Sequence, residues 1–316
     1  MALADRYDLV ELLGEGSFGQ VFRALDRVLG RTVAIKVLHR QDDDARRRFH
    51  REAVVLHSQL ANEFVVGLLD HTGLNDEDPY LVLEFCELKS LRRWVGAGYG
   101  WKDIATALLH AARGLAGLHA AGGLHRDIKP ENMLQARAPV APGWKVKLAD
   151  FGLAGFPHPV TGKMTRSAGG TEGYIAPEVL AGAEFHSPAD VYSLGIVAVE
   201  MLVGRIDSAP LLASGAPTVL KSLLQSMVSG RPEARPTARA VAEKLKVLLA
   251  PVPALPWILN SQPPVSMAPV AMQAGSSLAK GAAAVGLGVL AFGFLKWISD
   301  RGGSVGQDRG PDGRFR

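Results

Sequence analysis

Three apolar segments near the N-terminus have the composition of β-strands. Residues 7–13 and 20–25 flank a glycine-rich stretch, and residues 31–38 follow, rich in β-branched and other apolar side chains. Short runs of this kind, separated by turn residues, are typical of antiparallel neighbours. The pattern therefore predicts an antiparallel meander at the start of the chain.

The spacing of apolar residues then changes to a helical period. Residues 42–60 begin with three aspartates, which suit the positive end of a helix. Their apolar side chains recur three or four positions apart, at Phe49, Ala53, Leu56 and Leu60. This spacing predicts one amphipathic helix behind the meander.

The rest of the pattern divides the chain into two lobes. A further strand is predicted at 80–85, and helical periods recur at 104–119, 191–202 and 238–249. The sequence therefore predicts an α+β fold. A small β-rich lobe with one main helix covers about 5–85, and a larger α-helical lobe covers about 86–250.

The last part of the chain has a different composition. Residues 251–277 contain six prolines and no charged residue, which predicts a linker, and the glycine-rich tail at 299–316 is predicted to be disordered. Residues 281–295 are uncharged, but as a helix they would extend only about 22 Å against a bilayer core of roughly 30 Å. If Lys280 and Lys296 snorkel, residues 278–298 reach about 31 Å, so we expect a membrane-spanning helix there. A helix packed on the rest of the protein is the alternative.

Composition and charge narrow the class of protein. The 35 basic and 31 acidic residues are interspersed and give a net charge of only +4, so no nucleic-acid partner is predicted. Cys86 is the only cysteine, which excludes an internal disulfide and fits a reducing, cytoplasmic compartment. The N-terminus has no basic stretch followed by an apolar run, so no signal peptide is expected.

The glycine-rich stretch between the first two strands is the first candidate for chemistry. It consists of Gly14, Glu15, Gly16, Ser17, Phe18, Gly19, Gln20 and Val21. Glycines let a backbone approach phosphate groups closely, and Phe18 can close over them. The alternatives are an ordinary hairpin and a dinucleotide-binding turn, although the latter needs a helix directly afterwards.

A lysine in the third strand has a candidate partner on the following helix. Lys36 ends the apolar run that begins at Val33, and Glu52 lies within the predicted helix. The carboxylate could hold the ammonium toward the α- and β-phosphates of a nucleotide. An ordinary solvated lysine is the alternative.

One polar run identifies a family. It is His125-Arg126-Asp127-Ile128-Lys129-Pro130-Glu131-Asn132, and Asp150-Phe151-Gly152 follows it. With these positions filled in this order, the chain resembles the eukaryotic-type (Hanks-type) serine/threonine protein kinases, most closely their bacterial members. The resemblance implies a bilobal kinase fold that uses ATP and Mg²⁺ and acts on serine and threonine hydroxyls of proteins.

The resemblance also implies roles for individual residues. Asp127 would orient the substrate hydroxyl and accept its proton, and Lys129 would meet the γ-phosphate. Asn132 and Asp150 would hold Mg²⁺. Because the side chains that phosphoryl transfer requires are all present, we expect an active enzyme and not a nucleotide-binding scaffold.

Further matches extend the resemblance to about residues 5–250. They are Gly170-Thr171, Ala176-Pro177-Glu178, Asp190 and Arg235, of which Arg235 is expected to pair with Glu178. Lys129 and Thr171 match the serine/threonine branch, and the Ala-Pro-Glu motif argues against a small-molecule kinase.

A binding site for the nucleotide base is expected at the connection between the lobes. By the same resemblance, Leu83 is the gatekeeper, and the backbones of Glu84 and Cys86 face the adenine. Val21, Ala34 and Leu134 would enclose the ring, and plain core packing is the alternative. We expect Cys86 to act as a small hydrophobe.

Two departures from the family pattern concern substrate docking. Leu88 and Lys89 replace the glycine pair that usually follows the connection between the lobes, and the Asp190–Arg235 interval is shorter than in other family members. These departures put the peptide-docking surface in question.

One residue of the catalytic run concerns regulation. Arg126 needs an anionic partner, and kinases with this arginine are typically switched by phosphorylation of the activation segment. We expect autophosphorylation at Thr165, Ser167 or both; the alternative is an activation segment that is already ordered, with its hydroxyls merely solvated. No feature predicts an oligomeric state.

Overall fold

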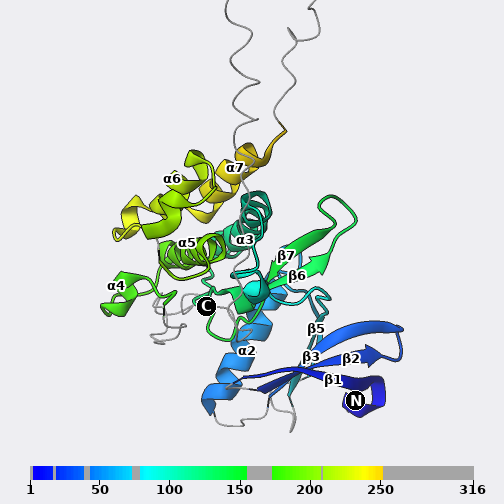
Figure 1. Ribbon diagram of the computed structural model, residues 1–316. Coiled ribbons are helices and arrows are strands. Elements are labelled where there is room, and N and C mark those ends of the chain that lie inside the picture. The colour runs from blue at the N-terminus through cyan, green and yellow to red at the C-terminus, as the bar shows by residue number, and fades with distance from the viewer. Residues whose placement is uncertain are drawn as a thin grey trace, which may run out of the picture. The chain divides into compact units, whose positions relative to one another are not determined.

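A five-stranded antiparallel sheet begins the structure, with strand order β1-β2-β3-β5-β4 (Figure 1). The strands are β1 (Tyr7–Gly16), β2 (Gly19–Asp26), β3 (Arg31–Leu38), β4 (Leu68–His71) and β5 (Tyr80–Glu84), and a short helix, α1 (Leu3–Arg6), precedes them. The computed structural model describes residues 3–16, 19–38, 43–72, 79–154, 173–207 and 209–251. The predicted meander is confirmed, but β4 has no counterpart among the predicted elements.

Helix α2 (Asp43–Ser58) is the main helix of this first lobe. It buries Phe49 and Leu56, as the helical period predicts. The prediction for Leu60 was wrong, because the helix ends at Ser58 and Leu60 is exposed in the turn that follows. The helix therefore packs its apolar side against the rest of the protein.

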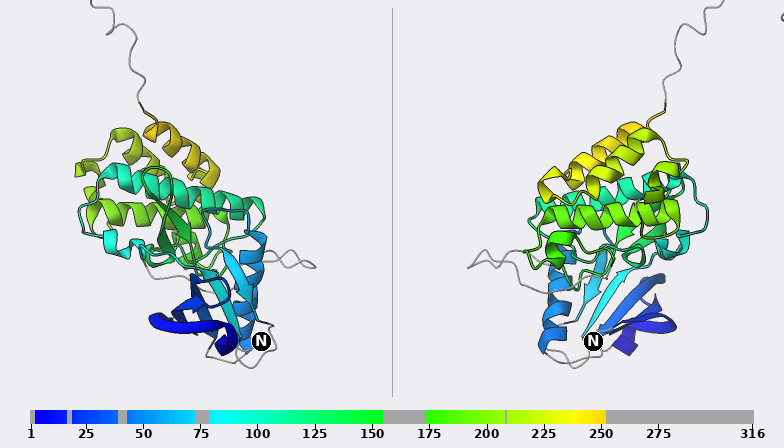
Figure 2. Two further views of the ribbon diagram at one scale, coloured as in Figure 1. Left: turned by 90° about the vertical axis from the view of Figure 1, so that its right-hand side faces the viewer. Right: turned by 60° about the vertical axis from the view of Figure 1, so that its left-hand side comes forward.

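In the described part of the second lobe, four longer helices and a hairpin are present (Figure 2). The helices are α3 (Trp101–Ala120), α5 (Ser187–Val203), α6 (Thr218–Met227) and α7 (Ala238–Leu249), and the hairpin pairs β6 (Met133–Arg137) with β7 (Trp144–Leu148). Short helical segments are η1 (Leu91–Trp94), η2 (Pro130–Asn132), α4 (Pro177–Leu180), η3 (Ala209–Ala213) and η4 (Pro232–Ala234). The α+β, bilobal architecture predicted from the sequence is confirmed.

Helices α3 and α5 form the centre of the second lobe. Helix α3 packs against α5, α7 and β7, and its residues Ile104, Leu108 and Leu115 are fully buried. Helix α5 is apolar on nearly all sides, and its close approach to α6 requires Gly195, where a Cβ would lie 2.9 Å from the Met227 Cβ. This tight packing gives the loops near the site a rigid base.

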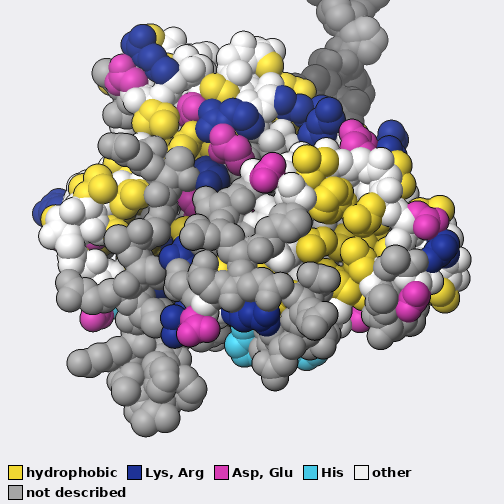
Figure 3. Space-filling model, turned by 90° about the horizontal axis from the view of Figure 1, so that it is seen from below, with side chains coloured by type: hydrophobic (Ala, Val, Ile, Leu, Met, Phe, Trp, Pro, Cys, Tyr) yellow, Lys and Arg dark blue, Asp and Glu magenta, His cyan; other side chains and the backbone are white. Residues whose placement is uncertain are grey.

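The first strand is an exception to the burial expected of apolar strands. Strand β3 buries Val33 and Ile35 completely, whereas β1 exposes Leu9, Val10 and Leu12 by 45–57%. Figure 3 views the molecule from below, from the side of the β-rich lobe in Figure 1, and shows hydrophobic side chains gathered on part of that surface. Strand β1 therefore contributes little beyond Tyr7 to the core of its lobe.

The predicted C-terminal segments lie outside the described residues. Residues Met1–Pro253 form one compact unit. Apart from Pro251, nothing of the predicted linker (251–277), membrane span (278–298) or tail (299–316) is described. Within the described ranges, no helix combines the length and the apolar character needed to cross a bilayer.

His110 on α3 is held in a neutral form by its surroundings. Its ring stacks on Phe64 with 5.2 Å between centroids, and it meets Trp144 edge-on. Its Nδ1 accepts a hydrogen bond from the amide of Val146 at 3.3 Å. Burial, assisted by the positive charge of Arg113, lowers the pKa of His110 to about 4.

This lowered pKa predicts a pH-dependent stability. Between pH 6.5 and about 4 the unfolded chain binds a proton that the folded chain excludes, so the contribution of His110 is complete above pH 6.5 and is lost as the pH falls toward 4. His110→Gln keeps an acceptor for Val146 but does not titrate. Its free energy of unfolding, measured by urea denaturation, should fall less steeply between pH 7 and 4 than that of the wild type. Equal slopes for both proteins would contradict this assignment.

Candidate active site

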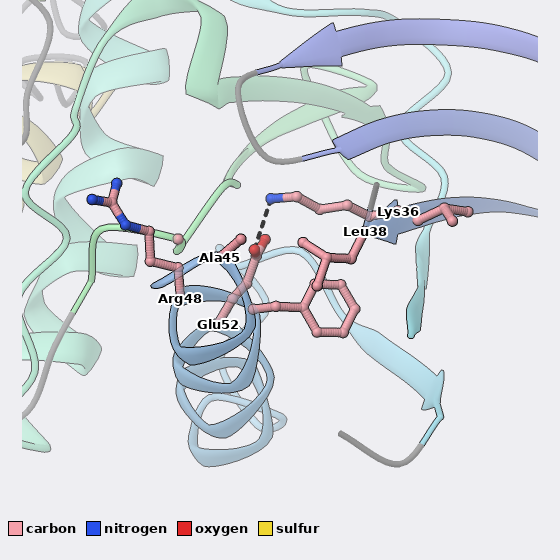
Figure 4. Close-up of a pocket in the computed structure, with 8 residues that line it drawn as sticks. Lys36, Leu38, Ala45, Arg48 and Glu52 are labelled. Atoms are coloured by element: carbon pink, nitrogen blue, oxygen red, sulfur yellow. Dashed lines mark hydrogen bonds and ion pairs between the residues drawn. The ribbon is translucent and has the colours of Figure 1, made fainter. Parts of the chain in front are cut away.

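Lys36 on β3 lies between two carboxylates. Its Nζ is 2.7 Å from Glu52 Oε2 on α2 and 3.0 Å from Asp150 Oδ1 (Figure 4, which draws the Glu52 contact). Although burial opposes the charge, Glu52 and Asp150 raise the pKa of Lys36 above its ordinary value. The ammonium therefore stays charged, and strand β3, helix α2 and the segment of Asp150 meet at it.

The two carboxylates differ in their surroundings. Glu52 is buried, and burial raises its pKa, whereas the charge of Lys36 lowers the pKa of the more exposed Asp150. Glu52 thus serves as the fixed, enclosed partner of Lys36. Asp150 presents its anionic carboxylate toward open space, where a cation could be bound.

The loop containing Asp127 places three polar side chains together. Asn132 Nδ2 donates to the backbone oxygen of Asp127 at 2.8 Å and to its Oδ2 at 3.0 Å. Lys129 Nζ lies 2.8 Å from the same Oδ2. One carboxylate oxygen is thereby held by two donors, which fixes the direction in which Asp127 points.

The backbone of this loop has an unusual conformation that Asp190 supports. Arg126 has φ of +70°, in the left-handed region that side-chain-bearing residues rarely adopt, and Asp150 in the segment after β7 shares this region with φ of +60°. The fully buried Asp190 of α5 accepts from the amides of His125 at 3.0 Å and Arg126 at 2.9 Å. His119 Nε2 lies 2.9 Å from Asp190 Oδ2 as a third partner.

His125 connects this loop to the segment of Asp150. Its Nε2 lies 3.2 Å from the Ala149 oxygen, and its Nδ1 is 3.4 Å from the amide of Asp127. Burial lowers the pKa of His125, which favours the neutral ring, donating from Nε2 and accepting at Nδ1. Its ring also packs against Phe151, with 4.7 Å between centroids.

The residues predicted to hold a metal have suitable donor atoms. Because the Asn132 nitrogen donates to Asp127, its amide oxygen is the atom left to face a cation. The backbone amide of Ala149 donates to the backbone oxygen of Asn132 at 2.9 Å and so keeps the neighbouring Asp150 close to that loop. An amide and a carboxylate oxygen suit Mg²⁺, which takes few protein ligands and keeps waters and phosphates. The described residues contain no cluster of three or more His, Cys, Asp or Glu with metal-binding geometry.

The described residues of the glycine-rich stretch lie at the end of β1 and the start of β2. Gly14, Glu15 and Gly16 end β1 and pair with Val21, Gln20 and Gly19 of β2. Ser17 and Phe18 lie outside the described residues. Packing also requires a glycine at position 19, because a Cβ there would collide with the backbone oxygen of Val37 on β3.

The residues expected around a nucleotide base are partly brought together. Leu83, Cys86 and Leu134 pack in one apolar cluster with Val66 and Ala136. Ala34 pairs with Leu83 across β3 and β5, and Val21 pairs with Lys36 across β2 and β3. Burial raises the pKa of the Cys86 thiol to about 12, so Cys86 packs as a neutral apolar group.

The polar contacts of two side chains near the site, Glu84 and Arg92, have no signal in the sequence pattern. The Glu84 side chain, expected to matter only through its backbone, accepts from the buried Lys147 at 2.8 Å and from the amide of Gly67 at 3.1 Å. Arg92 contacts Glu131 and Glu200 at 2.6 Å each. The partners of Glu84 and Arg92 are far apart in sequence. Two ion pairs were predicted from the sequence, and both are present. They are Lys36 with Glu52 at 2.7 Å, and Arg235 with Glu178, a bidentate contact with both bonds at 2.7 Å.

Comparison with known proteins agrees with this geometry. Residues 7–210 match the family model of the protein kinase domain. Because the match covers more than half of the chain, this protein belongs to the protein kinase family.

The chain is also similar to named bacterial kinases. A protein of Bifidobacterium longum named "Probable serine/threonine-protein kinase" is 36% identical over 209 residues, covering 64% of this chain and 27% of that protein. A protein of the same description from Clostridium perfringens is 35% identical over 209 residues, covering 65% and 30%. "Serine/threonine-protein kinase A" of Synechocystis is 35% identical over 226 residues, covering 66% and 42%. The chain thus matches less than half of the length of each relative.

Proposed function

We propose that this chain is a serine/threonine protein kinase that transfers the γ-phosphate of ATP to protein hydroxyls. The observation that carries the proposal is the convergence of Lys36, paired with Glu52, on Asp150, beside the loop that holds Asp127 and Asn132. The similarity to proteins named serine/threonine-protein kinases supports it.

In this proposal, each side chain has one physical task. Lys36 holds the α- and β-phosphates, with its charge fixed by Glu52, and Lys129 neutralises charge on the γ-phosphate. Asp127 orients the acceptor hydroxyl and takes its proton. Asn132 and Asp150 would hold Mg²⁺, which supplies charge neutralisation at the phosphates when bound.

The rest of the predicted nucleotide site belongs to the same proposal. The backbone of residues 14–19 would follow the phosphates, and the backbones of Glu84 and Cys86 would face the adenine. Val21, Ala34, Leu83 and Leu134 would form the apolar walls around the ring. We also propose that the kinase domain covers residues 1–250, which includes α6 and α7 beyond the matched range.

Asp127→Asn and Lys36→Met should each lower phosphoryl transfer by more than about a hundredfold, because each removes a charge at the reacting groups. Both changes leave core volume nearly intact, so both variants should stay folded. The thermal unfolding midpoint should change little for Asp127→Asn and should fall for Lys36→Met, which leaves the buried Glu52 without its cation. Transfer to a generic protein acceptor in the presence of Mg²⁺ is the measurement. Exposed Glu243 on α7 provides a matched control, and Glu243→Ala should keep full activity. Near-normal turnover by either site variant would remove the role assigned to that residue.

We propose further that autophosphorylation of the activation segment regulates the enzyme. Thr165 and Ser167 lie outside the described residues. Support comes from Arg126, whose pKa is lowered by burial and by the like charge of Arg51 on α2. Two guanidinium groups close enough to repel each other would be relieved by a phosphate dianion.

The double variant Thr165→Ala/Ser167→Ala should lose most of its activity, because no phosphate could then draw Arg126 and Arg51 together. Mass spectrometry of active wild-type enzyme should detect phosphate on one or both residues. Unmodified wild-type residues, combined with full activity of the double variant, would exclude this switch.

The membrane attachment predicted from residues 278–298 is also a proposal. Full-length protein should sediment with membranes after cell lysis, and deletion of residues 278–316 should release an active, soluble kinase, because the matched kinase region ends at residue 210. The kinase would then face the cytoplasm, where ATP is available. Full-length protein found only in the supernatant would contradict the anchor.

A further inference from the structure

The hairpin of β6 and β7 projects from the second lobe and ends in an apolar tip (Figure 1). The tip consists of residues 138–143, Ala-Pro-Val-Ala-Pro-Gly, and has no charged or polar side chain. Its last five residues are exposed, and Val140 exposes 71% of its surface. Contiguous exposed apolar residues, unlike isolated ones, are typical of contact surfaces.

The backbone of the tip has few amide groups that depend on water. Pro139 and Pro142 have no N–H group. The amide of Ala138 donates to the Gly143 oxygen at 2.9 Å, and the amide of Gly143 donates to the Val140 oxygen at 2.8 Å. Because unsatisfied backbone donors are costly in an apolar medium, this tip suits such a medium better than an ordinary loop does.

The base of the hairpin carries side chains that suit a boundary between apolar and aqueous surroundings. Arg137 is exposed, and Trp144, its partner across the hairpin, is half-buried with its ring edge-on to Trp94. Lys145 follows and pairs with Glu63 at 2.9 Å. Tryptophan and long basic side chains are the groups that anchor proteins at the interface of a bilayer. The tip beyond them would then lie among the lipid chains.

The charges around the base of the hairpin are nearly balanced. Arg137 and Arg93, which contacts Gln135 of β6, are both exposed. The carboxylate of Glu87 accepts from the Arg137 amide at 3.2 Å and adds a negative charge beside them. Attraction to a polyanion or an anionic lipid is therefore weak. Burial of apolar side chains in a neutral bilayer is the contact that the tip fits.

The chain itself brings a bilayer within reach of the tip. Beyond α7, residues 251–277 precede the membrane span proposed at 278–298. A flexible chain of this length has an end-to-end distance of about 30 Å, and an extended proline-rich chain reaches about 80 Å. A domain tethered at such a distance meets the bilayer at an effective concentration in the millimolar range. A weak apolar contact is then sufficient to orient the domain.

We propose that the apolar tip of the β6–β7 hairpin inserts into the interface of a bilayer and sets the orientation of the kinase domain on the membrane. The hairpin is continuous with the candidate site, because Asn132 directly precedes β6 and Asp150 follows β7 after one residue. Insertion of the tip therefore fixes the direction in which the site faces relative to the bilayer. This inference rests on the proposed membrane attachment and not on the proposed phosphoryl transfer.

The test measures the depth of position 140 in a bilayer. The full chain with Val140→Cys is labelled with the fluorophore NBD and reconstituted into phosphatidylcholine vesicles. Cys86 should stay unlabelled at neutral pH, because it is buried and its thiol has a raised pKa of about 12. Lipids with a nitroxide on the acyl chain should lower the emission at position 140 by about twofold or more, because the probe lies among the chains.

A matched control places the same probe on the other lobe. Val28 is 68% exposed in the turn between β2 and β3. With Val28→Cys as the labelled position, the nitroxide lipids should change the emission little, because this turn would remain in water.

A charge in the tip provides a second comparison. With the probe at Ala141→Cys, the additional change Val140→Asp should abolish the quenching, because a carboxylate is costly among lipid chains. Val28→Asp in the same labelled chain should leave the quenching unchanged. Both aspartates replace exposed valines, so the thermal unfolding midpoint should stay close to that of the wild type in both variants.

The outcomes separate this inference from the other proposals. Full chain that does not sediment with the vesicles would reject both the membrane span and this inference. Sedimentation without quenching at position 140, or with equal quenching at positions 140 and 28, would overturn the insertion of the tip and keep the anchor. No quenching is also the result expected if the tip instead contacts a pocket of another protein. Quenching that Val140→Asp leaves unchanged would likewise overturn the apolar contact. An absence of phosphoryl transfer would reject only the proposed function.

Discussion

The buried carboxylate of Asp190 is the constraint on which the geometry of the candidate active site depends. It accepts from two consecutive backbone amides, those of His125 and Arg126, and so stabilises a left-handed conformation that arginine would otherwise avoid. Although burial opposes ionisation, contacts such as that with His119 hold the pKa of Asp190 below its ordinary value. The carboxylate therefore stays charged, and Asp127, the next residue, has its direction fixed at the backbone.

Helix α5 extends this support to a second point of the site. The same apolar helix that carries Asp190 in its first turn carries Glu200 near its end, and Glu200 holds Arg92 and Tyr174. The two lobes then meet at Lys36, whose partners lie on α2 and at Asp150. A substitution at any of these contacts should therefore alter the positions of the reacting groups, because the contacts join the site to packed helices and strands.

The sequence predicts most of the fold and the site because the relevant signals are local. The helical period located α2, α5 and α7 to within a few residues, and the run around Asp127 contains residues whose side chains contact one another over short separations. Strand β4 was missed because it has only four residues. The contacts of Arg92 with Glu131 and Glu200 were missed for another reason. Contacts across 39 and 108 positions have no periodic signature, and a charged residue in a pattern is ordinarily assigned to the surface.

The central claim is that these side chains assemble a site for phosphoryl transfer to serine and threonine. The most direct measurement incubates the purified full chain and a protein acceptor with Mg²⁺ and ATP labelled at either the α- or the γ-phosphate, followed by phosphoamino-acid analysis. The account predicts label in phosphoserine or phosphothreonine from γ-labelled ATP alone. No transferred label, or label confined to phosphotyrosine, would contradict it.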